Sequence, residues 1–245
     1  MFVADQELLG GGVLAETARW MIGVLRGARP RSICIPEFPD FAGRCIGSTE
    51  VRCACVESTE DQLSALCRKL SGDFCFHTSA LLADQLGMAP GEEDAIDLLP
   101  QEIRDADLLV TSMFHAATLR TVAARLDKPL VVIRLNPEII RRLQNALADG
   151  EVTVVHVDPR FPERLRLLAG AHAERIRSVL ARDRRALTRL DRSHPMLISP
   201  AARDLLRDAD LPPSFLDGPL ISSESADELI ELLIRFNLEA VRERA

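Results

Sequence analysis

Aromatic side chains are scarce in this sequence, which has no tyrosine and a single tryptophan, Trp20. Proteins that hold nucleic-acid bases or flat cofactors by stacking depend on such rings, so a stacking site here would rest on few residues. No apolar run approaches the roughly 20 residues that cross a bilayer. The first residues, MFVADQELLGGGVLAE, carry acids where a secretory signal carries basic residues, so we expect a cytoplasmic protein.

The common motifs of nucleotide-binding and hydrolytic enzymes are also missing. There is no Walker A loop, and Gly10, Gly11 and Gly12 do not follow a strand as a dinucleotide fingerprint requires. A Gly-x-Ser-x-Gly nucleophile elbow and a His-Glu-x-x-His zinc motif are absent. Because no spacing nominates catalytic residues, we expect no catalytic group, no cofactor and no bound metal.

Positive charge is in deficit, since the net charge is −7. This balance argues against a broad basic surface, so we expect the chain by itself to bind duplex DNA no better than non-specifically. The arginine-rich run at 182–192 is interleaved with Asp183 and Asp191 and contains no aromatic residue. We interpret it as a solvated helix face in preference to a polyanion site.

All six cysteines lie between Cys34 and Cys75. In a cytoplasmic protein of this size we expect reduced thiols and no disulfide framework. Cys53 and Cys55 are two apart in a strand-like run, which places both side chains on one face. Paired thiols could bind a metal or act as a redox switch, but no Cys-x-x-Cys repeat completes a zinc site, so buried core residues are the favoured interpretation.

Strand-length apolar runs alternate with amphipathic helical patterns along the chain, which is typical of βαβ units and parallel sheets. The predicted fold class is therefore α/β, with two doubly wound parallel-sheet lobes and a C-terminal packing helix. Strands are expected at 32–38, 51–57, 73–79, 107–112, 130–135, 152–157, 175–180 and 196–199. Helices are expected at 58–70, 80–86, 115–126 and 159–168. For three more helices one end is expected: one begins at 136, one ends at 190 and one begins at 222.

The pattern restarts after Asp149 and Gly150, which suggests where one lobe ends. We expect a domain remnant or linker at 1–10, a first lobe at 11–149, a second lobe at 150–220 and a packing helix at 221–245. The final helix carries an apolar stripe at helical spacing, so it should pack on a lobe.

Ligands in open α/β sheets bind outside the carboxyl ends of the strands, against N–H groups of helix N-termini. Polar residues at these junctions are the candidate ligand-binding residues: Ser79, Thr111, Ser112, His115, Asn136, Asp158, Arg160 and Ser222. Each Ser, Thr, Asn or Asp among them is also a good helix cap, and that alternative stays open.

Two of these candidates have a more specific chemistry. His115, at the first turn of a helix, should stay neutral beside the positive end of the helix dipole. Arg160 could clamp a carboxylate or phosphate, or pair with Asp158 or Glu163 on the surface. We predict that His115, Ser112 and Arg160 contact one small, anionic ligand.

Two stretches carry a resemblance to a known family. Residues 110–116 (VTSMFHA), continuing through Leu119 and Arg120 to 129–138 (PLVVIRLNPE), resemble the effector-binding half of certain GntR-family transcriptional regulators. Residues 2–4 (FVA) look like the end of the wing hairpin that closes the winged-helix domain of that family. The resemblance implies an effector-sensing domain whose sequence follows a winged helix.

On this resemblance, two lobes like those of periplasmic binding proteins would hold a small-molecule effector in a cleft and signal by closing. The resemblance places DNA binding in a winged helix outside this sequence and allows a homodimer. The alternative is a cytoplasmic α/β enzyme, an isomerase or lyase that acts on a small acid. An interaction domain would need a large exposed apolar face, which the pattern does not show.

Overall fold

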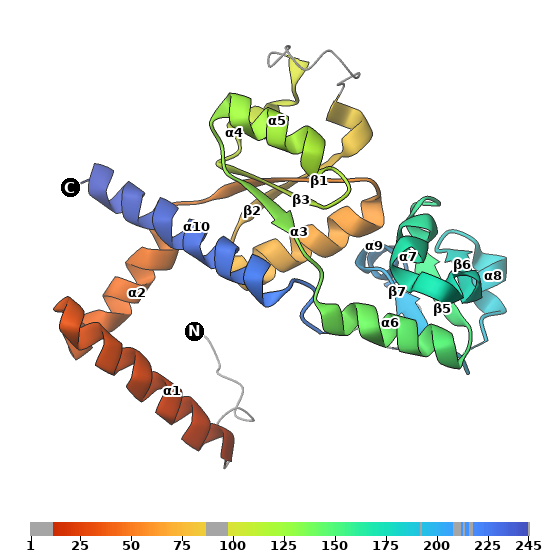
Figure 1. The fold of residues 1–245 in the computed structure, drawn as a ribbon, viewed down its shortest axis with the longest axis horizontal. Helices are drawn as coiled ribbons and strands as arrows, with labels where there is room; N and C mark the ends of the chain where they lie inside the picture. The colour runs from red at the N-terminus through yellow and green to blue at the C-terminus, as the bar shows by residue number, and fades with distance from the viewer. Residues whose placement is uncertain are drawn as a thin grey trace. The chain divides into compact units, whose positions relative to one another are not determined.

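The computed structural model describes residues 12–86, 98–191, 193–207, 212, 214–215 and 218–244 (Figure 1). The chain divides into two compact units, Glu50–Leu233 and Met1–Thr49 with Ile234–Ala245. The linker predicted at 1–10 lies outside the described residues. None of the helices in the described ranges is long and apolar enough to cross a membrane.

A four-stranded parallel sheet forms the first lobe of residues 50–233, with strand order β2-β1-β3-β4. Five of the six residues of β1 are buried, as is typical of parallel strands covered on both faces. The strands are β1 (Arg52–Glu57), β2 (His77–Leu82), β3 (Leu108–Ser112) and β4 (Leu130–Ile133). The helices are α3 (Glu60–Phe74), η4 (Ala83–Leu86), α4 (Gln101–Asp105) and α5 (Ala116–Leu126).

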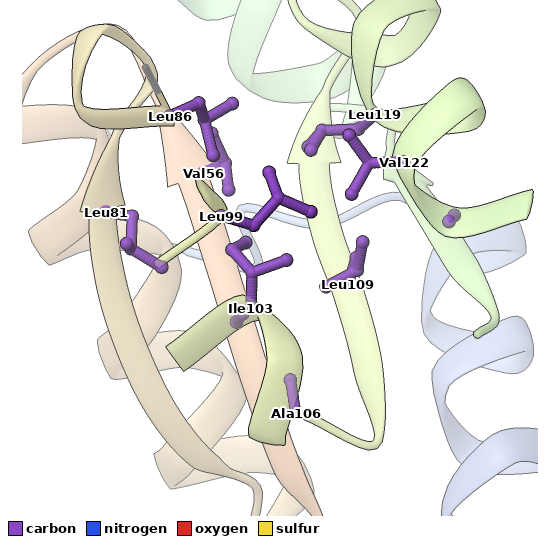
Figure 2. Close-up of a cluster of buried hydrophobic side chains, with 11 residues drawn as sticks. Val56, Leu81, Leu86, Leu99, Ile103, Ala106, Leu109, Leu119 and Val122 are labelled. Carbon is purple, nitrogen blue, oxygen red and sulfur yellow. The ribbon is translucent and has the colours of Figure 1, made fainter. Parts of the chain in front are cut away.

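Helices cover both faces of this sheet. Figure 2 shows Val56 and Leu109 of the strands packed against Ile103 of α4 and Leu119 of α5. On the opposite face, Cys53 and Cys55 of β1 are buried with their sulfur atoms 3.8 Å apart, and α3 packs against this strand. The predicted burial of Cys53 and Cys55 is confirmed.

A three-stranded parallel sheet forms the second lobe, with order β6-β5-β7. Phe161 and Leu165 pack on one face with Val154, and Ala202 packs on the other with Val155. The strands are β5 (Val152–His156), β6 (Ile176–Leu180) and β7 (Met196–Ile198). The helices are α6 (Pro137–Asp149), α7 (Phe161–Ala169), η6 (Gly170–Arg175), α8 (Arg184–Thr188) and α9 (Pro200–Leu205). The predicted α/β fold with two doubly wound parallel sheets is therefore confirmed.

In each parallel sheet there is one point where the strand order reverses, because successive strands are added on opposite sides of the first one. From β1 the chain adds β2 on one side and later β3 on the other, and from β5 it adds β6 and then β7. These switch points, β1/β3 and β5/β7, leave a crevice outside the carboxyl ends of their strands. The fold thus supplies two crevices in residues 50–233.

The other unit is helical in its described residues. Backbone N–H groups of Ser48 and Thr49 donate to the buried side-chain oxygen of Asn237, at 2.5 and 2.9 Å. The helices are α1 (Gly12–Ala28), η2 (Arg29–Arg31), η3 (Ile35–Glu37) and α2 (Phe38–Gly47), and α10 (Ser223–Glu243) reaches into this unit. The predicted C-terminal helix is confirmed.

Two predicted strands need correction. The strand expected at 32–38 is wrong, because these residues form η3 and the start of α2, each with a proline in its first turn. The strand expected at 73–79 begins only at His77, because Phe74 still belongs to the buried stripe of α3. Cys75 then ends the helix in a left-handed conformation, with φ of 58°.

Candidate functional site

A cavity of about 490 Å³ lies within residues 50–233, and its lining includes the carboxyl ends of β1 and β3 and the residues that follow β7. This volume lies in the range of small-molecule sites. Most of the wall is hydrocarbon from three helices: Ala65 and Leu66 of α3, Ile139, Ile140 and Leu143 of α6, and Phe161, Leu165 and Leu168 of α7.

A buried carboxyl group stands at the β1/β3 switch point. Glu57 ends β1 with only 2% of its surface exposed, and Ser112 ends the neighbouring β3. The backbone N–H and the hydroxyl of Ser112 donate to the two Glu57 carboxylate oxygens, at 2.6 and 3.0 Å. Burial raises the pKa of Glu57, while these hydrogen bonds and the charge of Arg164 offset part of the rise.

Arg164 brings a positive charge to the same cavity from the middle of α7. Its guanidinium lies over the ring of Phe114, with the central carbon 5.1 Å from the ring centre. Among the described residues, no carboxylate forms an ion pair with Arg164. Stacking uses the face of a guanidinium and leaves its N–H edge available to a ligand oxygen.

His115 and Thr111 support this end of the cavity without lining it. The His115 Nε2 lies 2.7 Å from the Ser58 hydroxyl, and burial, aided by the charge of Arg164, lowers the pKa of His115. The Thr111 hydroxyl donates to the Val56 carbonyl at 2.7 Å, within the sheet.

The second switch point is already filled by a carboxylate of the chain itself. Asp61, in the first turn of α3, is fully buried and lines the cavity. It accepts hydrogen bonds from the backbone N–H of Val157 at 3.0 Å, from that of Asp158 at 2.8 Å and from the Ser199 hydroxyl. These donors follow β5 and β7, so an acid from the first lobe occupies the crevice of the second.

Arg160 lies apart from the cavity lining. Its Nη2 donates to Asp158 at 2.7 Å, and its Nη1 lies 3.3 Å from Asp84. The Arg160 hydrogen bond holds the pKa of Asp158 below its usual range. The structure thus shows the pairing with Asp158 that the sequence left open for Arg160, although Asp158 itself is buried.

The remaining candidates take backbone or capping roles. Asn136 accepts from the Glu138 N–H at the start of α6, and Ser222 accepts from the Ser225 N–H at the start of α10. Ser79 lies in β2 opposite Ala54. Of the eight candidates only Ser112 lines the cavity, His115 lies next to it, and the structure does not bring Arg160 to these two.

Sequence reasoning missed Glu57, Asp61 and Arg164. The junction rule that nominated Ser112 applies equally to Glu57, which ends the apolar run VRCACVE. Asp61 has the signature of a helix start, where an acid is expected for the dipole alone. Arg164 lies a full turn inside its helix, so only the packing of α7 shows that it lines the cavity.

No protein-family model, curated protein or solved structure matches this chain. No group of three or more metal-ligating side chains is found among the described residues. The cavity and its charged groups therefore give the functional proposal its support.

Proposed function

We propose that residues 50–233 bind a small molecule in this cavity and break no bond in it, as the effector-sensing part of a transcriptional regulator. One observation carries the proposal: an apolar cavity of about 490 Å³ opens where the strands end, and Glu57, Ser112 and Arg164 converge in its lining. Apolar walls with a few convergent polar groups are the usual make-up of small-molecule sites.

A molecule in this cavity would contact both lobes. Its wall combines Ser112 and α3 of the first lobe with α7 and Ser199 of the second. Contacts to two lobes let a ligand favour one arrangement of the lobes over another, which is what a sensor requires. The resemblance of residues 110–138 to GntR-family effector domains supports the regulatory part of the proposal.

The test is saturable binding of anilinonaphthalene sulfonate, followed by its fluorescence. Ala65→Trp adds an indole to the cavity wall, whereas Ala124→Trp adds one to the exposed face of α5. We expect wild type and Ala124→Trp to bind the dye at one site, and Ala65→Trp to lose that site. Equal binding by both variants, or no saturable binding by wild type, would overturn the proposal.

One observation favours an enzyme as the second candidate. Burial raises the pKa of Glu57 at the wall of a cavity, as in carboxyl groups that act as general acids or bases. The enzyme would be an isomerase or lyase acting on a small acid. Mass spectrometry of small molecules carried by the purified protein would name candidate substrates, and turnover that disappears in Glu57→Gln would favour the enzyme.

A further inference from the structure

We infer that the cavity takes a monocarboxylate with an apolar body, with the carboxylate on Arg164 and the body between α6 and α7. The inference rests on the proposed function, because it assigns a ligand class to the same cavity.

The charged groups of the cavity show where the ligand head belongs. Five charged side chains line it, and four already have polar partners inside the protein. The engaged groups and their partners are Glu57 with Ser112, Asp61 with Val157, Asp158 and Ser199, Arg68 with Asp204, and Lys69 with Asp73. Arg164 has no hydrogen bond or ion pair among the described residues, and its guanidinium lies over the ring of Phe114. The N–H groups at the edge of the Arg164 guanidinium are therefore available to donate to a ligand, and their fork geometry matches a carboxylate.

A cationic head fits this end of the cavity poorly. It would approach Arg164, and the two buried acids that could attract it are already held by donors of the protein. An anionic head is attracted by the positive charge of Arg164. The repulsion from Glu57 is limited, because Ser112 donates to both of its oxygens and burial raises its pKa.

The wall beside Arg164 specifies the rest of the molecule. Apart from Arg164 itself, the cavity-lining side chains of α6 and α7 carry no hydrogen-bonding group: Ile139, Ile140, Leu143, Phe161, Leu165 and Leu168. A sugar or a second carboxylate buried there would lose its hydrogen bonds to water without replacement. A hydrocarbon body instead gains from burial against these side chains.

The experiment compares three amphiphiles with the same hydrocarbon chain, namely decanoate, decanol and decylamine, each below the concentration at which it forms micelles or a separate phase. Binding is measured by the shift in Tm and by displacement of anilinonaphthalene sulfonate. We expect decanoate to bind roughly tenfold more tightly than decanol or decylamine, as one charge-assisted pair implies. In Arg164→Gln this advantage should vanish, while decanol binding stays at the wild-type level.

Three further variants separate the binding role of Arg164 from a general effect on α7. Arg166→Gln removes a guanidinium from the same helix, where Arg166 pairs with Glu163, and should keep the preference for decanoate. Arg164→Lys keeps the charge but loses the fork, so it should retain part of the preference and serves if Arg164→Gln fails to fold. Arg160→Gln should also leave decanoate binding unchanged.

The outcomes distinguish the ligand class from the cavity itself. Equal binding of all three amphiphiles, a preference that survives Arg164→Gln, or dye binding that none of them displaces would overturn the monocarboxylate and leave the cavity proposal standing. Failure of the dye to bind wild type would overturn both.

Discussion

The folded protein favours the neutral form of His115. Its environment lowers its pKa first through burial and second through the positive charge of Arg164. The ring accepts from or donates to the Ser58 hydroxyl through Nε2, which a neutral imidazole can do without paying for a buried charge. The residue therefore couples stability to pH in a defined direction.

We predict that His115 makes the protein less stable as the pH falls below about 6.5, the ordinary pKa of histidine. Below that pH His115 takes up a proton more readily in the unfolded chain than in the folded chain. The stability that neutral His115 contributes is therefore present above that pH and lost below it. Urea unfolding at pH 7.5 and pH 5.5 should show a smaller loss of stability in His115→Gln than in wild type. His172→Gln, which leaves Ser58 and Arg164 in place, serves as the control, and an equal pH effect in both variants would contradict the prediction.

At the scale of elements, α3 is the helix on which the site depends most. It begins after Thr59, whose extended backbone and side-chain oxygen, 3.3 Å from the Gln62 N–H, form an N-cap. This cap fixes the first turn, and that turn carries Asp61 into the crevice of the second lobe. The start of α3 is therefore important for stability and for the shape of the cavity.

We predict that Thr59→Ala lowers the free energy of unfolding by about 1 kcal/mol or more, because it removes the capping side chain of a fully buried residue. Thr59→Ser keeps the hydroxyl, so its loss in free energy of unfolding should be at most roughly half of the loss in Thr59→Ala. The matched control is Thr121→Ala in the interior of α5, where alanine is the better helix former and stability should hold or rise slightly. Chemical denaturation measures all three, and similar losses in Thr59→Ala and Thr121→Ala would count against the cap.

The individual helices and strands also show how far sequence patterns predict this structure. The β3–α5 unit was predictable to within one residue at each end, because a buried strand run leads directly into a helical stripe. The run at 32–38 has the composition of a strand, but Pro36 and Pro39 suit helix starts better than a ladder. For the site, the carboxyl edge with Ser112 was predictable, whereas Arg164 required the tertiary orientation of α7.

For the whole molecule, net charge sets the expectation for nucleic acid. At −7 the chain as a whole repels a polyanion. We predict that it binds duplex DNA only non-specifically, and that weak binding at low salt disappears at physiological salt. Gel retardation with a set of duplexes at two salt concentrations measures this. Retardation of one sequence that resists salt would contradict it.

The two lobes of residues 50–233 should unfold as one unit, because α3 connects them. Asp61 joins this first-lobe helix to the ends of β5 and β7, and Arg68 of the same helix pairs with Asp204 of α9. Loss of a buried carboxylate with three donors lowers the free energy of unfolding strongly, since each donor left without a partner costs about 1–3 kcal/mol. The Asp61 contacts should therefore contribute most of the coupling between the sheets.

We predict that Asp61→Ala lowers stability by about 3 kcal/mol or more and lets the second sheet open before the first. Native-state hydrogen exchange of Val154 and Val155 in β5, compared with Val56 in β1, reports on the two sheets separately. In wild type the three amides should exchange through one common opening, and in Asp61→Ala the β5 amides should exchange much faster than that of Val56. Asp73→Ala on the same helix removes an exposed acid that pairs with Lys69, so it should cost less than about 0.5 kcal/mol and keep the common opening. Unchanged, equal exchange of both strands in Asp61→Ala would show that the lobes are coupled by other contacts.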